Sequence, residues 1–223
     1  MPMKISSTLL RLPVNNTGRD FAVGDIHGEV ARLQQQLDAI GFDRDNDRLI
    51  CVGDLIDRGP QSAQALALLE EPWFFSVIGN HEHLMVSALK HKNSEHRMTW
   101  LAHGGEWIAS TSPANWPLWF DAIEALPLAI EVESKTGVRY GIVHADFPYA
   151  SWNEVEQLDS DEAMRAVWSR HSFQKKLDYT VADIDWILHG HNVHEDGELV
   201  LGNRVYIDQG AYMGNEFIIK ELV

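Results

Sequence analysis

Three apolar runs in the first part of the chain each stop at a glycine that is followed by a carboxylate or an amide. They are DFAVGD (20–25), RLICVGD (48–54) and WFFSVIGN (73–80). Each run has the length of a buried strand, and the glycine and polar residue at its end are typical of a tight turn. This repeated pattern constrains where the strands end and where the polar groups that follow them can lie.

Each run is followed by a segment with helical periodicity. The segments are 29–42, 61–71 and 81–91. In the first of them, Val30, Leu33, Leu37 and Ile40 fall on one face of a helix. Strands that alternate with helices in this way predict an α/β fold with a parallel sheet and right-handed crossovers.

The rest of the chain has a different pattern. Residues 95–126 are rich in Trp, and we expect them to be helical and irregular. Further strands are predicted at 128–133, 138–145, 185–190 and 198–208, and EFIIKELV (216–223) closes the chain. A hairpin turn is expected at Gly202-Asn203. No repeat or linker divides the sequence, so we expect one domain over residues 1–223, with a parallel first half and a more antiparallel second half.

The composition limits where such a protein can act. Of the 223 residues, 45% are hydrophobic, which is enough for a large core. No apolar stretch approaches the roughly 18 to 20 residues of a membrane span, and residues 1–16 lack the features of a signal peptide. The single cysteine, Cys51, excludes an internal disulfide, and we expect it to be a buried strand residue. These features predict a cytoplasmic protein with no membrane partner.

The net charge limits the partners. The formal charge is −15, which argues against a nucleic-acid binder because phosphate backbones are bound by Lys and Arg. An acidic chain favours divalent cations. An anionic substrate must therefore be met by positive charge close to the site and not by the field of the whole protein.

Chemically active side chains follow five of the predicted strands. They are Asp25 and His27; Asp54, Asp57 and Arg58; Asn80 and His81; His144; and His189 and His191. The carboxyl ends of strands in an open α/β sheet form the binding crevice. Any one Gly-Asp or Gly-Asn pair could simply turn the chain or cap a helix. Capping does not account for the repeated histidines, so we interpret the five ends as one site.

The residue types in this site indicate metal chemistry. Carboxylate, amide and imidazole ligands without thiolates suit divalent Mn, Fe or Zn. The ligands are too many for one ion, whereas two ions about 3.5 to 4 Å apart, bridged by a carboxylate, would use them all. Arg58 could hold phosphate oxygens beside such a pair. Arg170 is a second candidate, although its spacing alone also fits a surface residue.

The motifs GDIHG, GDLIDRG, GNHE, VHAD and GHN, in this order, resemble the metallophosphoesterase superfamily. Within it they are similar to the serine/threonine phosphoprotein phosphatases of the small bacterial and phage type. The resemblance extends from about Phe21 to Tyr212, and HADFP, WSR and YIDQGA add agreement. It implies an α/β/β/α sandwich with two mixed β-sheets that forms a single calcineurin-like phosphatase domain.

The resemblance also implies roles for individual residues. Asp25 and His27 bind the first metal, Asp54 bridges both, and Asn80, His144 and His191 complete the second. The ions implied are two divalent cations, with Mn²⁺ favoured and Fe or Zn as alternatives. The resemblance assigns phosphate binding to Arg58 and Arg170, and general acid catalysis to His81 paired with Asp57.

Two departures from the family pattern concern the shape of the pocket. The usual GHT is GHN here, and Gln209 replaces a Thr before the last Gly-Ala. His189 leaves a further alternative open, because strand alternation would place it on the same face as His191. The family alignment favours His191 as the ligand. The remaining histidines are expected at the surface or in the core: His83, His91, His96, His103, His171 and His194.

The function implied is hydrolysis of phosphoprotein or phosphopeptide monoesters by direct attack of a dimetal-bound hydroxide. The alternative is symmetrical hydrolysis of dinucleoside tetraphosphates by a related family with similar motifs. Asp57 and Glu82 match the phosphatases at the positions where that family typically differs. A binding scaffold without catalysis would need a broken ligand set, and this set is complete. The substrate protein, the preference between Ser/Thr and Tyr phosphates, and the oligomeric state stay open.

Overall fold

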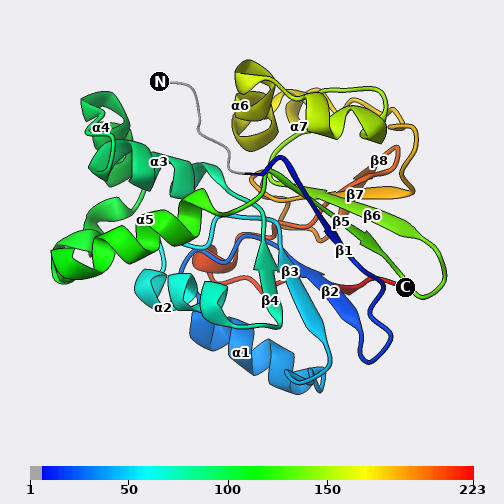
Figure 1. Ribbon diagram of the computed structural model, residues 1–223, viewed down its shortest axis with the longest axis horizontal. Helices are drawn as coiled ribbons and strands as arrows, with labels where there is room; N and C mark the ends of the chain where they lie inside the picture. Colours follow the sequence, from blue (N-terminus) through cyan, green and yellow to red (C-terminus); the bar gives the residue numbers. More distant parts are fainter. Residues whose placement is uncertain (1–6) are drawn as a thin grey trace.

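Two β-sheets lie face to face, with helices on the outer side of each (Figure 1). The computed structural model describes residues 7–223, so the signal-peptide prediction for residues 1–16 falls partly outside the described residues. In Figure 1, helices α1 (Val30–Ala39) and α2 (Ser62–Ala67) cover the four-stranded sheet, while α6 (Ser160–Trp168) and α7 (His171–Gln174) cover the six-stranded one. The α/β/β/α sandwich that the resemblance implied is confirmed.

The four-stranded sheet contains the three strands with which the sequence begins its alternation. Its order is β10 (Ile219–Glu221), β2 (Asp20–Val23), β3 (Arg48–Cys51) and β4 (Phe74–Ser76). The β2–β3 and β3–β4 pairs are parallel, as predicted, and β10 is antiparallel to β2. Side chains alternate between the two faces: Phe21 and Val23 join the larger apolar cluster with α1, and Ala22 joins the cluster between the sheets.

The six-stranded sheet contains both parallel and antiparallel pairs. Its order is β1 (Leu9–Leu12), β5 (Ala129–Glu133), β6 (Arg139–Val143), β7 (Trp186–His189), β9 (Arg204–Tyr206) and β8 (Leu199–Leu201). The β5–β6 pair and the β8–β9 hairpin are antiparallel and the other three pairs are parallel, so the second half is more antiparallel than the first, as expected. The long helical connection between β6 and β7 allows these two strands to run parallel. Strand β1 was not predicted.

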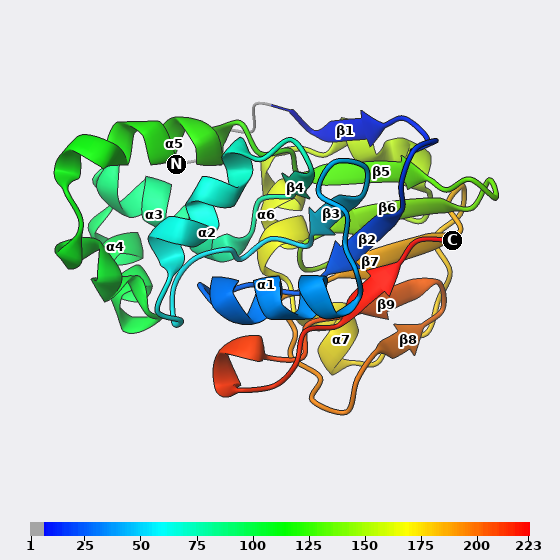
Figure 2. The same ribbon diagram turned by 90° about the horizontal axis from the view of Figure 1, so that it is seen from below.

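A third group of helices lies beyond one end of the sheets. It contains α3 (Asn80–Leu89), α4 (Ser94–Ala102) and α5 (Trp116–Glu124), with the short 3₁₀ helices η2 (Gly105–Ser110) and η3 (Pro113–Asn115). Figure 2 shows these helices together on the left, past the strand ends. Helices α4, α5, η2 and η3 make up the Trp-rich region, which is helical and irregular as predicted, and α3 is the helix predicted at 81–91. Three further 3₁₀ helices are η1 (Leu68–Glu70), η4 (Trp152–Gln157) and η5 (Ala211–Met213).

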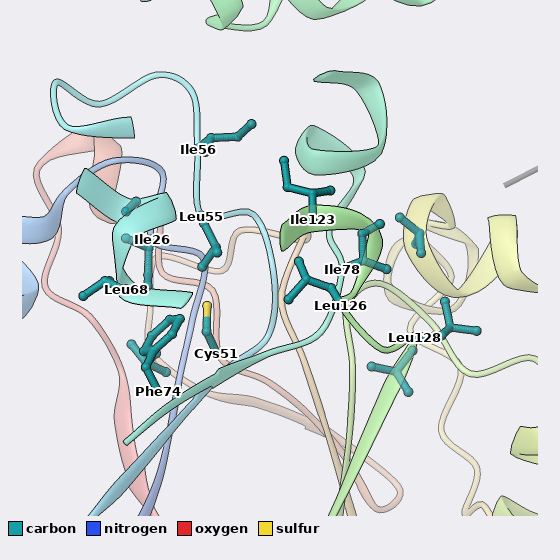
Figure 3. Packing of buried hydrophobic residues seen from close by; sticks show 14 of the residues in the cluster. Ile26, Cys51, Leu55, Ile56, Leu68, Phe74, Ile78, Ile123, Leu126 and Leu128 are labelled. Carbon is teal, nitrogen blue, oxygen red and sulfur yellow. The ribbon is translucent and has the colours of Figure 1, made fainter. Parts of the chain in front are cut away.

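The loop after β3 is anchored in the core. Cys51 is fully buried, as predicted, and Leu55 and Ile56 beyond the strand end are fully buried as well. Figure 3 shows Leu55 and Ile56 on the loop that follows β3, among the packed residues of the larger cluster. Burying these two aliphatic side chains fixes the loop that carries Asp54 and Asp57.

None of the helices within residues 7–223 is long and apolar enough to cross a membrane.

The apolar face predicted for the first helix is shorter in the structure. Val30, Leu33 and Leu37 are buried, but α1 ends at Ala39 and Ile40 is 39% exposed. Ile40 therefore does not belong to the core face.

This difference gives a stability test. We expect Leu33→Ala to lower the free energy of unfolding by about 2 to 5 kcal/mol, because the cavity it leaves is fully enclosed. The matched change Ile40→Ala should cost less than about 1 kcal/mol. Urea unfolding followed by circular dichroism measures both, and equal losses would contradict the assigned burial.

Candidate metal and phosphate site

The six predicted metal ligands are all buried, and most of them gather around one carboxylate. His27, His81 and Asp54 form one group of potential ligand atoms, and Asp54, His144 and His191 form another; within each group the atoms lie within 4.8 Å of one another. These groups were found among the described residues. Asp54 belongs to both groups, which is the position that a bridging ligand requires.

The distances place imidazole nitrogens around the Asp54 carboxylate. Its Oδ2 lies 3.7 Å from His27 Nε2, 3.9 Å from His81 Nε2 and 3.4 Å from His144 Nε2. Asp25 Oδ2 lies 3.9 Å from His27 Nε2. Both Asp25 oxygens also accept the backbone N–H of His191, at 3.1 and 3.0 Å, which ties the end of β7 to the end of β2.

The histidine tautomers direct lone pairs into this space. His27 Nδ1 is 2.8 Å from the Ile56 carbonyl and His144 Nδ1 is 2.7 Å from the Val52 carbonyl. A carbonyl only accepts, so Nδ1 carries the proton and, in a neutral ring, Nε2 presents a lone pair. His144 Nε2 then faces the Asn80 Oδ1 at 3.0 Å. Two acceptors this close require positive charge between them, which a proton on Nε2 or a bound cation supplies. A backbone carbonyl behind the ring is the usual support of a metal-binding histidine.

The electrostatics of the cluster lead to the same requirement. Burial, together with the nearby Asp208 and Asp54 carboxylates, raises the pKa of Asp25 well above its usual value. Burial lowers the pKa of His27 well below its usual value, so this ring stays neutral. Burial also opposes ionisation of Asp54, but His144 and His81 outweigh it and hold the pKa of Asp54 well below its usual value. Burial lowers the pKa of His144, but Asp54 in turn outweighs burial and raises this pKa above its usual value. Several buried carboxylates gathered around imidazoles fit divalent cations.

The backbone at these residues adopts a rare conformation. His27, Asp54, Asp57, Arg58 and His191 have φ angles of 44°, 51°, 73°, 69° and 63°. Non-glycine residues seldom occupy this left-handed region, and those that do concentrate at functional sites. At Gly79 the crowding is extreme, since a Cβ there would lie 2.2 Å from Asp54 Oδ1. A Cβ on Gly53 would lie 2.8 Å from His144 Nδ1, so these two glycines make room for the ligands.

Glu82 holds the loop that carries Asp54. Its Oε2 accepts the backbone N–H groups of Asp54 and Gly79, both at 3.0 Å, and its Oε1 accepts those of Leu55 at 2.8 Å and Ile56 at 3.3 Å. The sequence had indicated Glu82 only as a residue that separates two families. In the structure it supports the loop backbone.

His81 and Asp57 form a buried pair. His81 Nδ1 lies 2.6 Å from Asp57 Oδ2, and the Nε2 on the other side of the ring faces Asp54. Burial lowers the pKa of His81, but the Asp54 and Asp57 carboxylates outweigh it and raise the pKa above its usual value. Two indoles, Trp100 and Trp107, also donate to Asp57, and nothing in the sequence pattern indicated these contacts.

A cavity of about 170 Å³ opens beside the ligands. Its lining includes Asn80, His81, His191 and both predicted arginines, together with Leu84, Thr99, His103 and Trp168. Arg58 Nη1 lies 2.7 Å from His27 Nε2. Arg170 Nη1 donates to the His191 carbonyl at 2.8 Å and to the Asn192 side chain at 3.1 Å. His103, which was expected at the surface or in the core, is exposed and lines this cavity.

His189 occupies a different environment from His191. Its Nδ1 lies 2.8 Å from the Val143 carbonyl, and its ring stacks on Tyr206 with centroids 5.1 Å apart. It belongs to neither group of potential ligand atoms found among the described residues. Strand β7 ends at His189, so the alternation that placed both side chains on one face does not extend to His191.

Sequence reasoning passed over Asp208, which follows β9. Its Oδ1 accepts the Gly210 N–H at 2.9 Å, whereas its buried Oδ2 has no partner within the described residues. Burial raises the pKa of Asp208 to about 6. The sequence does contain a signal for this residue, because Asp208 in YIDQGA is another carboxylate at the end of a predicted strand.

Comparison with known proteins agrees with this geometry. Residues 21–196 match the family of calcineurin-like phosphoesterases. The chain belongs to this family. It is therefore a hydrolase of the metallophosphoesterase superfamily, and the metal-ligand chemistry of the buried cluster is that of a metal-dependent enzyme.

Two bacterial relatives match most of the chain. Serine/threonine-protein phosphatase 2 of Escherichia coli K12 is 34% identical over 197 residues, which cover 86% of this chain and 87% of the relative. Serine/threonine-protein phosphatase 1 of Salmonella typhimurium LT2 is 33% identical over 216 residues, which cover 95% of each chain.

Similarity to tetraphosphatases covers only part of the sequence, whereas the fold is similar over nearly the whole chain. A symmetrical bis(5'-nucleosyl)-tetraphosphatase of Methylococcus capsulatus is 42% identical over 82 residues, covering 33% of this chain and 30% of that protein. A solved structure provisionally named a diadenosine tetraphosphatase covers 97% of both chains with a TM-score of 0.65 and 21% identity. At that identity the structural match shows the fold alone.

The support given by Glu82 can be tested by an isosteric change. We expect Glu82→Gln to lower the free energy of unfolding by about 2 to 3 kcal/mol, because an amide NH₂ would face backbone N–H donors. Burial, with a smaller effect of Asp54, raises the pKa of Glu82 to about 7, so the measurement belongs at pH 8, where the carboxylate is ionised.

The control is Glu162→Gln. Glu162 is half-buried and accepts one backbone N–H, that of Asp159, together with the Tyr149 hydroxyl. We expect a loss of about 1 kcal/mol or less there. Similar urea midpoints for Glu82→Gln and the unchanged protein would contradict the role of Glu82 in supporting the loop that carries Asp54.

Proposed function

We propose that this chain is a metal-dependent phosphomonoesterase that removes phosphate from serine and threonine residues of proteins or peptides. The observation that carries the proposal is the convergence of Arg58, Arg170 and the His81–Asp57 pair on one cavity beside the ligand cluster. Two relatives that bear the name serine/threonine-protein phosphatase, matched over most of their length, support the same substrate class. We take residues 1–223 as one catalytic domain.

The site is proposed to bind two divalent ions, with Mn²⁺ favoured and Fe or Zn as alternatives. We assign Asp25 and His27 to the first ion and Asp54 to both. Asn80, His144 and His191 complete the second. When bound, such ions neutralise phosphate charge and lower the pKa of water so that it can attack phosphorus.

The arginines are proposed to hold the non-bridging oxygens of the phosphate. Arg58 is fixed from one side by Tyr212, whose ring centroid lies 4.4 Å from the guanidinium carbon. Arg170 is fixed by the His191 carbonyl and Asn192. Two guanidinium groups held in this way present several N–H donors to a trigonal phosphoryl group in a fixed orientation.

His81 is proposed to protonate the leaving oxygen. Asp57 accepts from Nδ1 and orients the ring, so Nε2 is directed toward the cavity. As the bond from phosphorus to the serine oxygen breaks, the proton on Nε2 passes to that oxygen, and the ring regains a proton from solvent. General acid catalysis of this kind contributes roughly 10²- to 10⁴-fold to the rate.

The substrate class is tested by comparing three phosphate compounds. With Mn²⁺, we expect hydrolysis of a phosphoserine peptide and of p-nitrophenyl phosphate, and little cleavage of diadenosine tetraphosphate. A chelator should abolish both activities, and Mn²⁺ should restore them. Phosphate release and nucleotide chromatography give the rates. A kcat/KM that is highest for the tetraphosphate would favour the alternative that the partial relative suggests.

The bridging role of Asp54 is tested by metal content. We expect Asp54→Asn to reduce bound Mn²⁺ from about two ions per chain to less than one, because both positions lose a charged ligand. Asp47→Asn is the control, since Asp47 is 4% exposed but pairs with Arg19 outside the site. Equilibrium dialysis with elemental analysis measures the content. Two tightly held ions in Asp54→Asn would exclude bridging.

A further inference from the structure

The carboxylate of Asp57 accepts hydrogen bonds from two tryptophans. Trp100 Nε1 donates to Oδ2 at 2.8 Å, and Trp107 Nε1 donates to Oδ1 at 2.7 Å. His81 Nδ1 contacts the same Oδ2 at 2.6 Å. Asp57 has no exposed surface, so these three groups take the place of water around its charge.

Three donors around one buried carboxylate fix its orientation. An indole can only donate, so both tryptophans stabilise the ionised form of Asp57. Rotation of the carboxylate about its Cβ–Cγ bond would break the bonds on both oxygens at once. The direction of the His81 ring follows from that of the carboxylate, because Nδ1 must meet Oδ2. By fixing the carboxylate, the two indoles also fix the direction in which His81 Nε2 points.

The same segment of chain also fits against the loop that carries Asp57 and Arg58. Trp100 lies on α4 and Trp107 on η2, with Gly104 between them. Gly104 has a φ of 107°, and a Cβ there would lie 2.5 Å from the Arg58 backbone nitrogen. Only glycine allows this approach. The contact lies beside two residues whose own φ angles are positive, Asp57 at 73° and Arg58 at 69°.

We propose that Trp100 and Trp107 are positioning residues of the hydrolysis, which orient the Asp57–His81 pair through their indole N–H groups. The inference rests on the proposed phosphatase function. It gives the Trp-rich region between α3 and β5 a role in the reaction, beyond packing. It also means that α4 and η2 determine how well the leaving oxygen receives its proton.

Packing alone would give a different outcome, and two other tryptophans provide matched controls. Trp152 is 1% exposed, like the fully buried Trp100, and donates to a carboxylate, Glu131, at 2.7 Å. Trp116 is half-buried, like Trp107, and donates to Thr111 Oγ1 at 3.0 Å. Replacing each by Phe keeps an aromatic ring and removes the N–H. Loss of packing should then be similar within each pair.

The experiment compares the four Trp→Phe variants of the full chain with Mn²⁺ bound. We expect kcat on a phosphoserine peptide to fall about tenfold in Trp100→Phe and in Trp107→Phe, and about 100-fold in the double variant, within the range of general acid catalysis. KM should change less than about twofold. The loss should be much smaller on p-nitrophenyl phosphate, whose leaving group needs little protonation. Trp152→Phe and Trp116→Phe should keep the kcat of the unchanged protein on both substrates.

A second measurement observes the hydrogen bonds without turnover. In ¹H–¹⁵N spectra, the indole resonances of Trp100 and Trp107 should shift in Asp57→Asn, whereas those of Trp152 and Trp116 should not. If Trp100→Phe does not fold, Trp107→Phe and its control decide the kinetic test.

Several outcomes would overturn the inference. They are equal losses of kcat on both substrates, kcat values that match the controls, or unmoved indole resonances. If the unchanged protein hydrolyses no phosphate ester, the proposed function fails and the inference falls with it. If that protein is active and the Trp variants behave as the controls do, the inference alone is wrong.

Discussion

The rest of the site depends on the charge of one buried carboxylate. Asp54 Oδ2 lies within 3.9 Å of three imidazole nitrogens, and its Oδ1 accepts the backbone N–H of His81. The Asp54 carbonyl accepts the N–H groups of Ile26 and His27, which joins the ends of β2 and β3 through the backbone as well. Such a charge can be buried only where donors or cations surround it. Glycine at position 79 leaves room for this carboxylate, and Glu82 fixes the backbone of the loop that carries it.

Much of the fold, and the convergence of the ligands on one site, could be predicted because the sequence patterns that indicate them are local. Each strand of the first half ends at a glycine and a polar side chain, and the structure does bring Asp54 and Asn80 close to His144, which follows a strand of the other sheet. Strand β1 gave no such indication: it has four residues, and its pairing with β5 joins distant segments. The parallel direction of β7 depends on how the α6–α7 connection packs, which periodicity does not encode.

Contacts made across long stretches of sequence account for what the sequence could not reveal about the site. Trp100 and Trp107 are 43 and 50 residues from Asp57, and a Trp-rich helical segment reads as core whether or not its indoles find a carboxylate. His103 is expected at the surface or in the core and is exposed, but the packing of α4 also places it at the cavity. Asp208 follows the strand-end rule, but the pattern does not reveal that its Oδ2 is buried without a partner among residues 7–223.

The left-handed backbone at His27, Asp54 and His191 also restricts how this site could evolve or be redesigned. Apart from glycine, the residues that tolerate such φ angles best are Asn, Asp and His. These three are also oxygen and nitrogen donors for borderline-hard ions. The backbone conformation of the turns thus limits which residue types can serve as ligands at these positions. A designer who introduced Cys at these positions to favour a softer metal would meet a conformational cost of about 1 to 2 kcal/mol per residue before any metal was bound. A redesign that changes the metal preference of such a centre would therefore have to change the backbone of the turns before it changes the ligands.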